Sequence, residues 1–221
     1  MEKVIQDGAA VRFGWQTFKD NVGFLIGAMV VTLVALLVLF GVAFGLGNYS
    51  MTLSAIAMIA YYALAIVVGI GWMKIALTFV DGGKPTYADL FKHWNLFLKY
   101  FGVSLLYALI VMGGTLLFVI PGMYWSLKFY FAPFLVIDKG MGPIEALKES
   151  ARLTDGVKWD LFGFMMVAGT VAMLGYIALF VGVIVSAPVA GLALAFVYRK
   201  VQQQSGEAAA TMAAPTQTPT V

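Results

Sequence analysis

Lys128 is the residue whose type and position could do chemistry in this sequence. It is the only charged residue between positions 100 and 137, and it lies in the apolar segment 123–137. A lysine in the hydrocarbon of a membrane is costly and marks an ion or substrate path. The structural alternative is a short or re-entrant segment, from which Lys128 extends past Tyr124 and Trp125 toward the outer interface. Both interpretations stay open, as does whether 123–137 spans fully.

Few other residues suit acid–base or metal chemistry. Cysteine is absent and His93 is the single histidine, which excludes thiolate and multi-histidine metal sites. We expect His93 at the surface. Asp81 opens Asp-Gly-Gly-Lys-Pro-Thr, which lacks the Gly-Lys-Ser/Thr ending of a phosphate-binding loop. Gly-Gly and Pro predict a helix end, and Thr86 with Asp89 predicts the cap of the next helix. We therefore predict no catalytic, cofactor-binding or metal-binding residues.

The elements around Lys128 must be membrane helices, as the composition indicates. Of 221 residues, 62% are hydrophobic and 11% are charged, whereas soluble domains carry about 25% charged residues. A water-soluble fold of this length could not bury so much apolar surface. We predict an all-α, polytopic helical bundle over residues 1–201. Residues 202–221, rich in Gln, Ala, Thr and Pro, are expected to form a disordered cytoplasmic tail.

The apolar runs predict about six membrane crossings. A spanning helix needs about 20 apolar residues. The run from 103 to 137 contains Pro121-Gly122, which predicts a break there, and the run from 161 to 198 is too long for one span and must turn near 180–188. The predicted spans are residues 23–46, 53–80, 99–120 and 123–137, and two within 161–198, with 123–137 interrupted again at Pro133.

The basic residues predict the orientation of these spans. Lys and Arg precede the first span, lie in the connectors 81–99 and 138–160, and follow the last span, whereas the turns near 48, 121 and 182 contain none. Cytoplasmic loops retain Lys and Arg. Six spans with both termini in the cytoplasm place every basic connector on one side of the membrane. The net charge of +3 is modest, so we predict no nucleic-acid partner.

Three tryptophans precede apolar runs. Trp15, Trp94 and Trp159 each open a semi-polar stretch that leads into such a run, which predicts three helical hairpins, each introduced by a cytoplasmic interfacial helix. Trp rings anchor well at the headgroup level, so we interpret all three as interfacial anchors. Residues 143–153 predict an amphipathic helix with Ile144, Leu147 and Ala151 on its apolar face.

Three motifs carry a family resemblance. They are Ile-Pro-Gly-Met-Tyr at 120–124, Ala-Pro-Phe-Leu-Val-Ile-Asp-Lys-Gly at 132–140 and Pro-Ile-Glu-Ala-Leu-Lys-Glu-Ser at 143–150. The chain resembles a family of prokaryotic multi-pass membrane proteins related to the membrane domain of glycerophosphoryl diester phosphodiesterases. The resemblance covers most of residues 8–201 and implies a six-helix domain in the prokaryotic plasma (inner) membrane. The catalytic barrel of those enzymes has no counterpart here, so no active site is implied.

Three functions fit these observations. The favoured one is a non-enzymatic membrane module that packs with itself, with lipids or with a partner protein. Small-residue pairs such as Gly23 with Gly27 allow close helix packing within a bundle or dimer. The alternative is a small transporter or channel with a midplane site near Lys128 in interrupted spans. A lipid-modifying enzyme is the least favoured, because acid pairs, metal ligands and activated nucleophiles are missing.

Overall fold

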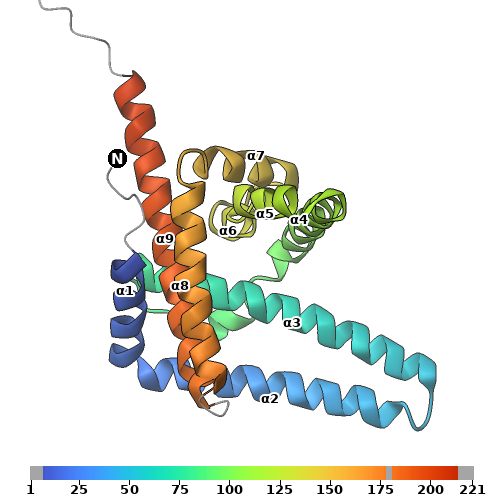
Figure 1. The fold of residues 1–221 in the computed structure, drawn as a ribbon. Coiled ribbons are helices and arrows are strands. Elements are labelled where there is room, and N and C mark those ends of the chain that lie inside the picture. Colours follow the sequence, from blue (N-terminus) through green and yellow to red (C-terminus); the bar gives the residue numbers. More distant parts are fainter. Residues whose placement is uncertain (1–6, 178–180, 214–221) are drawn as a thin grey trace, which may run out of the picture.

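The computed structural model describes residues 7–177 and 181–213, which form helices joined by short turns, with no strand among them. This confirms the all-α prediction (Figure 1). The helices are α1 (Asp7–Asp20), α2 (Val22–Leu46), α3 (Met51–Val80), the 3-10 turns η1 (Tyr87–Leu90) and η2 (Trp94–Leu96), α4 (Phe97–Leu117), α5 (Val119–Lys128), α6 (Ala132–Lys139), α7 (Pro143–Leu153), α8 (Lys158–Ile177) and α9 (Val181–Ala213).

Four helical stretches of the described chain are long and apolar enough to cross a membrane: Val22–Leu46, Met51–Val80, Tyr87–Leu117 and Ile184–Gly206. The first two correspond to α2 and α3, and they match the predicted spans 23–46 and 53–80. The predicted turn between them is also present, where the Ser50 side chain caps α3 by accepting a hydrogen bond from the Leu53 amide. The predicted cap after α3 is confirmed too, because Asp89 accepts hydrogen bonds from the amide and hydroxyl of Thr86.

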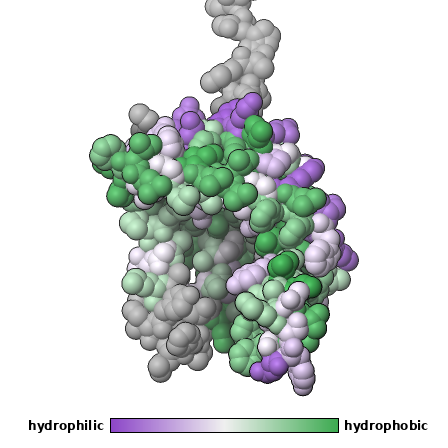
Figure 2. Space-filling view, turned by 90° about the vertical axis from the view of Figure 1, so that its right-hand side faces the viewer, coloured by the Kyte–Doolittle hydropathy of each residue, from purple (hydrophilic) through white to green (hydrophobic). Residues whose placement is uncertain are grey.

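The helical hairpins do not run parallel. Figure 1 shows the α2–α3 hairpin crossing the α8–α9 hairpin steeply, with its outer half projecting from the rest of the molecule. Apolar side chains on that outer half, such as Leu37, Phe44 and Ile59, are exposed. Figure 2 shows the side toward which this outer half projects, with apolar side chains over much of it and hydrophilic ones mainly along its upper end and right edge. A large apolar surface is therefore left uncovered by the chain itself.

The segment 123–137, predicted as one span interrupted at Pro133, lies in two short helices. The chain breaks first at Phe118, whose backbone is extended, and Pro121 lies in the first turn of α5 rather than at the break. It breaks again after Lys128, before α6 begins with Pro133 in its first turn. Gly122 lets α5 fold back tightly against α4, because a Cβ there would meet the Thr115 backbone at 2.8 Å.

The end of the chain also differs from expectation. The turn expected near 180–188 is bounded by Ile177 and Val181, so its central residues 178–180 lie outside the described part, and Pro188 is inside α9. The tail expected to be disordered from 202 is helical as far as Ala213. Its Gln, Ala, Glu and Met residues are good helix formers, and extending an existing helix avoids the cost of a new nucleus. Residues 214–221 lie outside the described part.

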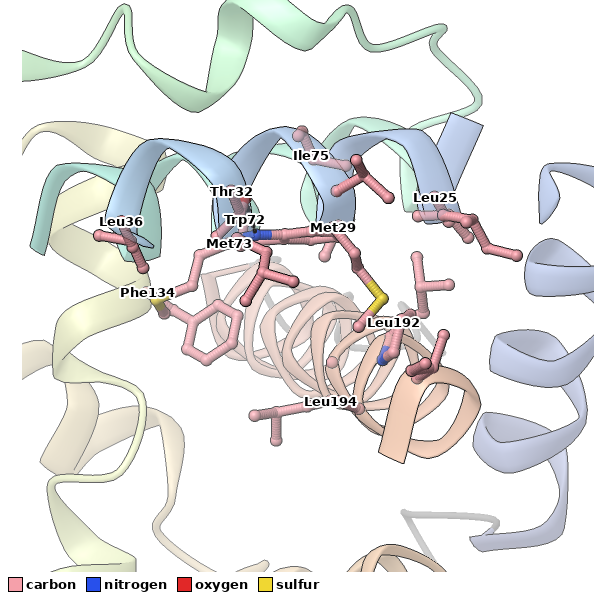
Figure 3. Close-up of a pocket in the computed structure, with 18 residues that line it drawn as sticks. Leu25, Met29, Thr32, Leu36, Trp72, Met73, Ile75, Phe134, Leu192 and Leu194 are labelled. Atoms are coloured by element: carbon pink, nitrogen blue, oxygen red, sulfur yellow. Dashed lines mark hydrogen bonds between the residues drawn. The ribbon is translucent and has the colours of Figure 1, made fainter. Parts of the chain in front are cut away.

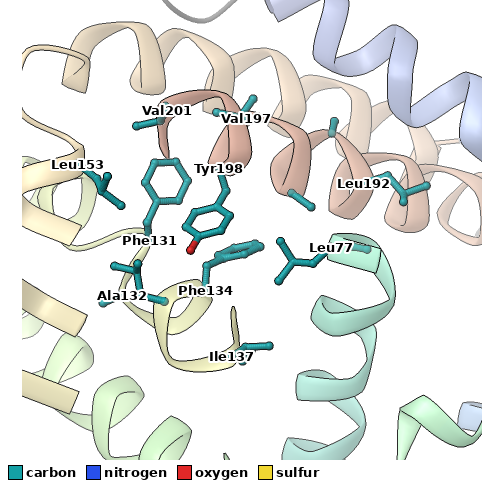
Figure 4. Close-up of a cluster of buried hydrophobic side chains, with 14 of the residues drawn as sticks. Leu77, Phe131, Ala132, Phe134, Ile137, Leu153, Leu192, Val197, Tyr198 and Val201 are labelled. Carbon is teal, nitrogen blue, oxygen red and sulfur yellow. The ribbon is translucent and has the colours of Figure 1, made fainter. Parts of the chain in front are cut away.

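The core lies where α9 crosses α1, α3, α6 and α7. Tyr198 of α9 is fully buried and its ring stacks on Phe134 at 5.2 Å between centroids, with Phe131 beside both (Figure 4).

The amphipathic helix 143–153 is confirmed as α7, but Ile144 is exposed, and the buried face consists of Ala146, Leu147, Ser150 and Leu153. Ile144 is on the wrong face because α7 turns its Ser150 side toward the break between α5 and α6.

Candidate functional site

The most concentrated polar arrangement in the described chain surrounds Arg199. Its guanidinium binds Asp81 through Nε and Nη2 at 2.8 and 2.7 Å, and Asp138 through Nη1 and Nη2 at 2.6 and 2.8 Å. Nη1 also donates to the Gln202 side chain at 3.0 Å. Tyr198 donates its hydroxyl to Asp138 at 3.0 Å and accepts from Gln202. We call these five residues the Arg199 cluster.

Helix ends position the members of the Arg199 cluster. Asp81 is the residue that follows α3, and Asp138 lies in the last turn of α6. Tyr198, Arg199 and Gln202 share one side of α9, because positions three and four apart in a helix are neighbours. The cluster therefore ties together three segments that are far apart in the sequence.

Burial within the cluster is uneven. The side chains of Asp138 and Arg199 are 11% and 19% exposed, whereas that of Asp81 is 49% exposed. Burial alone would raise the pKa of the Asp138 carboxyl, but the hydrogen bonds and positive charge of Arg199, with the Tyr198 hydroxyl, together lower it below its usual value. Asp138 is thus held as a carboxylate, which keeps the cluster intact at neutral pH.

The hydrogen-bonding groups of the Arg199 cluster bind one another and so hold the ends of α3 and α6 against α9. A guanidinium has five N–H donors, and the five hydrogen bonds to Asp81, Asp138 and Gln202 account for all of them. A fork-like pairing with two carboxylates is geometrically specific. No donor of Arg199 is left for an anionic substrate, so the arrangement fixes helix ends relative to one another.

Lys128 lies at the end of α5, half-buried, with its ammonium 5.6 Å from the centroid of the Phe129 ring. The break that follows it is satisfied by α7: the Ser150 hydroxyl donates to the Lys128 carbonyl and accepts from the Phe131 amide. The Thr154 hydroxyl lies 3.0 Å from the same carbonyl. Lys128 is therefore close to the connector 138–160, which the sequence predicts to be cytoplasmic. Its functional role stays a prediction.

Tyr124, which the re-entrant alternative places along the path of Lys128 to the outer interface, has a different lysine next to its ring. The ammonium of Lys158, at the start of α8, is 5.2 Å from the centroid of the Tyr124 ring. This contact also brings α5 next to the beginning of α8.

The three tryptophans predicted as anchors all lie at exposed positions. Trp15 is on α1, Trp94 begins η2 and Trp159 is in the first turn of α8. The structure does not bring them together, and their anchoring role stays a prediction.

His93, expected at the surface, is half-buried at the cap of η2, and its Nε2 is buried without a hydrogen-bond partner in the described part of the chain.

Sequence reasoning missed the Arg199 cluster. The sequence predicts Asp81 as a turn residue, places Asp138 at the start of the connector 138–160 and places Arg199 after the last span, and it gives no link between them. The available signal was that each follows or ends an apolar run on the same predicted side of the membrane, where opposite charges can meet. Among the described residues, no group of three His, Asp or Glu side chains could hold a metal ion.

Comparisons with known proteins give relatives without an assigned role. The chain is 27% identical to an uncharacterised protein of Mycobacterium bovis and to one of Mycobacterium tuberculosis, and each match covers 87% of this chain and 67% of the relative. No solved structure matches. No family model matches either, so the resemblance to the membrane domain of glycerophosphoryl diester phosphodiesterases rests on the motifs alone.

Proposed function

We propose that this chain is a multi-pass protein of the prokaryotic plasma membrane, related to the phosphodiesterase membrane domains that it resembles. Both termini face the cytoplasm. The protein acts as a non-enzymatic module that packs with itself, with lipids or with a partner protein. The bacterial relatives and the four apolar helices are compatible with this location.

The observation that carries the proposal is the outer half of the α2–α3 hairpin. It projects from the body of the molecule (Figure 1), and its apolar side chains are exposed, Leu37 by 57% and Phe44 by 73%. Soluble monomers rarely expose contiguous apolar surface on this scale, and larger patches mark protein or membrane contacts. The hairpin is therefore a packing surface for lipid or for another helix.

The use of charge supports a non-enzymatic role. All donors of Arg199 are bound by its partners, Glu149 accepts hydrogen bonds from Nε and Nη2 of Arg152, and Asp155 pairs with Lys158. A catalytic acid or base must be within reach of the proton that it transfers. The Arg199 cluster instead joins helix ends, Arg152 and Glu149 pair within α7, and Lys158 and Asp155 pair across the turn that precedes α8.

Photo-crosslinking in intact bacterial membranes tests the packing role. A photoreactive residue at Leu37, exposed on α2, should give a discrete heavier adduct, either with a second copy or with a partner. The matched control is Ala28 on the same helix, which is fully buried and should give none. Lipid adducts alone at Leu37 would reject protein packing, and recovery of the chain in the soluble fraction would reject the proposal as a whole.

The second candidate, a transporter, is favoured by one feature: the chain is interrupted at Phe118 and again between Lys128 and Ala132. Broken helices form the substrate sites of many transporters. A Lys128→Met variant that still inserts but loses a solute-dependent growth phenotype would support transport. Wild-type behaviour of that variant would remove Lys128 as a site.

A further inference from the structure

An apolar cavity lies between the α2–α3 hairpin and α9. Its volume is about 690 Å³. Figure 3 shows Met29 of α2 and Trp72 of α3 on one side, facing Leu192 of α9, with Phe134 of α6 at the far end. Thr32 and Trp72 are the lining residues with polar side chains, and Trp72 Nε1 donates to Thr32 Oγ1 at 3.1 Å. The described lining residues include no charged side chain.

This lining selects a hydrocarbon ligand. A polar group placed in the cavity would lose hydrogen bonds to water without gaining others, which is costly. Met29 and Met73 have unbranched side chains that adapt to a flexible ligand. We infer that the cavity binds one acyl chain of a membrane lipid.

The size of the cavity fits a single chain better than a helix of a second copy. A cavity of about 150 Å³ accepts a benzene molecule, so by proportion this one holds on the order of 25 carbon atoms. That is enough for one long acyl chain. A helix about 10 Å wide would fill the same volume within about two turns, which is too short for stable helix packing.

The open side of the cavity gives an acyl chain a way in from the lipid. Val30 and Leu33 of α2 and Ile184 of α9 both line the cavity and are exposed. The exposed apolar surface continues from them along α2 to Leu37. The inference rests on the proposed function, because that proposal places this surface in lipid. An acyl chain can then enter the cavity laterally from the bilayer. The inner end is closed by Phe134, whose ring stacks on Tyr198 of the Arg199 cluster.

Fluorescence quenching of Trp72 tests the inference. The full chain in detergent is titrated with stearic acid carrying a spin label, and the signal of Trp72 is obtained by subtracting that of Trp72→Phe in each background. Gly191→Leu fills the cavity, since Gly191 lines it and a Cβ there meets nothing within 4 Å. Ala187→Leu is a second filler. Gly41→Leu is the control, equally unobstructed but outside the lining.

Saturable quenching is expected in the wild type and in Gly41→Leu. Both fillers should raise the half-quenching concentration about tenfold, as when about two methylene groups lose their burial. Equal quenching in all four proteins, or none in the wild type, overturns the acyl-chain site. Flotation with phosphatidylcholine vesicles distinguishes two kinds of failure. If the protein floats with the vesicles but shows no saturable quenching, only the acyl-chain site is rejected. If the protein does not float, both the membrane proposal and the acyl-chain site are rejected.

Discussion

Arg199 has two carboxylate partners with different exposure, and this difference predicts different costs of removal. Asp138→Asn leaves the guanidinium facing a nearly buried neutral partner and should destabilise the protein by about 2–3 kcal/mol. Asp81 is half-exposed, so Asp81→Asn should cost about 1 kcal/mol or less. Thermal unfolding in one detergent measures both. Equal losses would show that burial does not set the energetics of the Arg199 cluster.

The lowered pKa of Asp138 predicts a loss of stability in acid. A carboxyl whose pKa is lower in the folded than in the unfolded protein stabilises the fold fully above its unfolded pKa, about 4. That contribution is lost as the pH falls from there through the lowered pKa, where Asp138 takes up a proton and weakens its bonds to Arg199. The unfolding temperature of the wild type should therefore drop more steeply below pH 4 than that of Asp138→Asn. Parallel curves would contradict this assignment.

At the scale of elements, α1 docks on α9 through a close contact. A Cβ on Gly14 would collide with the Val189 carbonyl, and Phe13 stacks on Phe196 at 4.9 Å between centroids. Gly14→Ala should therefore destabilise the protein by about 1–3 kcal/mol through overpacking. Gly8→Ala in the same helix meets no atom within 4 Å and should be neutral or slightly stabilising. Limited proteolysis of α1 reports both. If the two variants behave alike, α1 is not held by this contact.

An element can be predicted from the sequence when the residues that determine it lie close together in the chain. α2 and α3 have long apolar runs with a polar turn between them, and the Thr86–Asp89 cap is local, so these followed from the sequence. The break between α5 and α6 falls after Lys128 rather than at Pro133, where an interruption is predicted, and its carbonyl and amide are bound by hydroxyls of Ser150 and Thr154, about twenty residues away. Such tertiary bonds leave no periodic pattern, and for the same reason the Arg199 cluster, with partners 118 and 61 residues apart, was not predicted.

At the scale of the whole molecule, the Arg199 cluster can be compared with the orientation that Lys and Arg predict. Asp81, Asp138 and Arg199 come from segments that the sequence assigns to one side of the membrane, and the structure brings them into contact.

Cysteine labelling of intact and permeabilised cells tests the central claim most directly, since the chain has no native cysteine. Single cysteines at Gly83 and Gly140 should react with a membrane-impermeant maleimide only after permeabilisation. Cysteines at Tyr49 and Gly182 should react in intact cells. Reaction of Gly83 and Tyr49 from the same side would show that α3 does not cross the membrane, and would contradict the account.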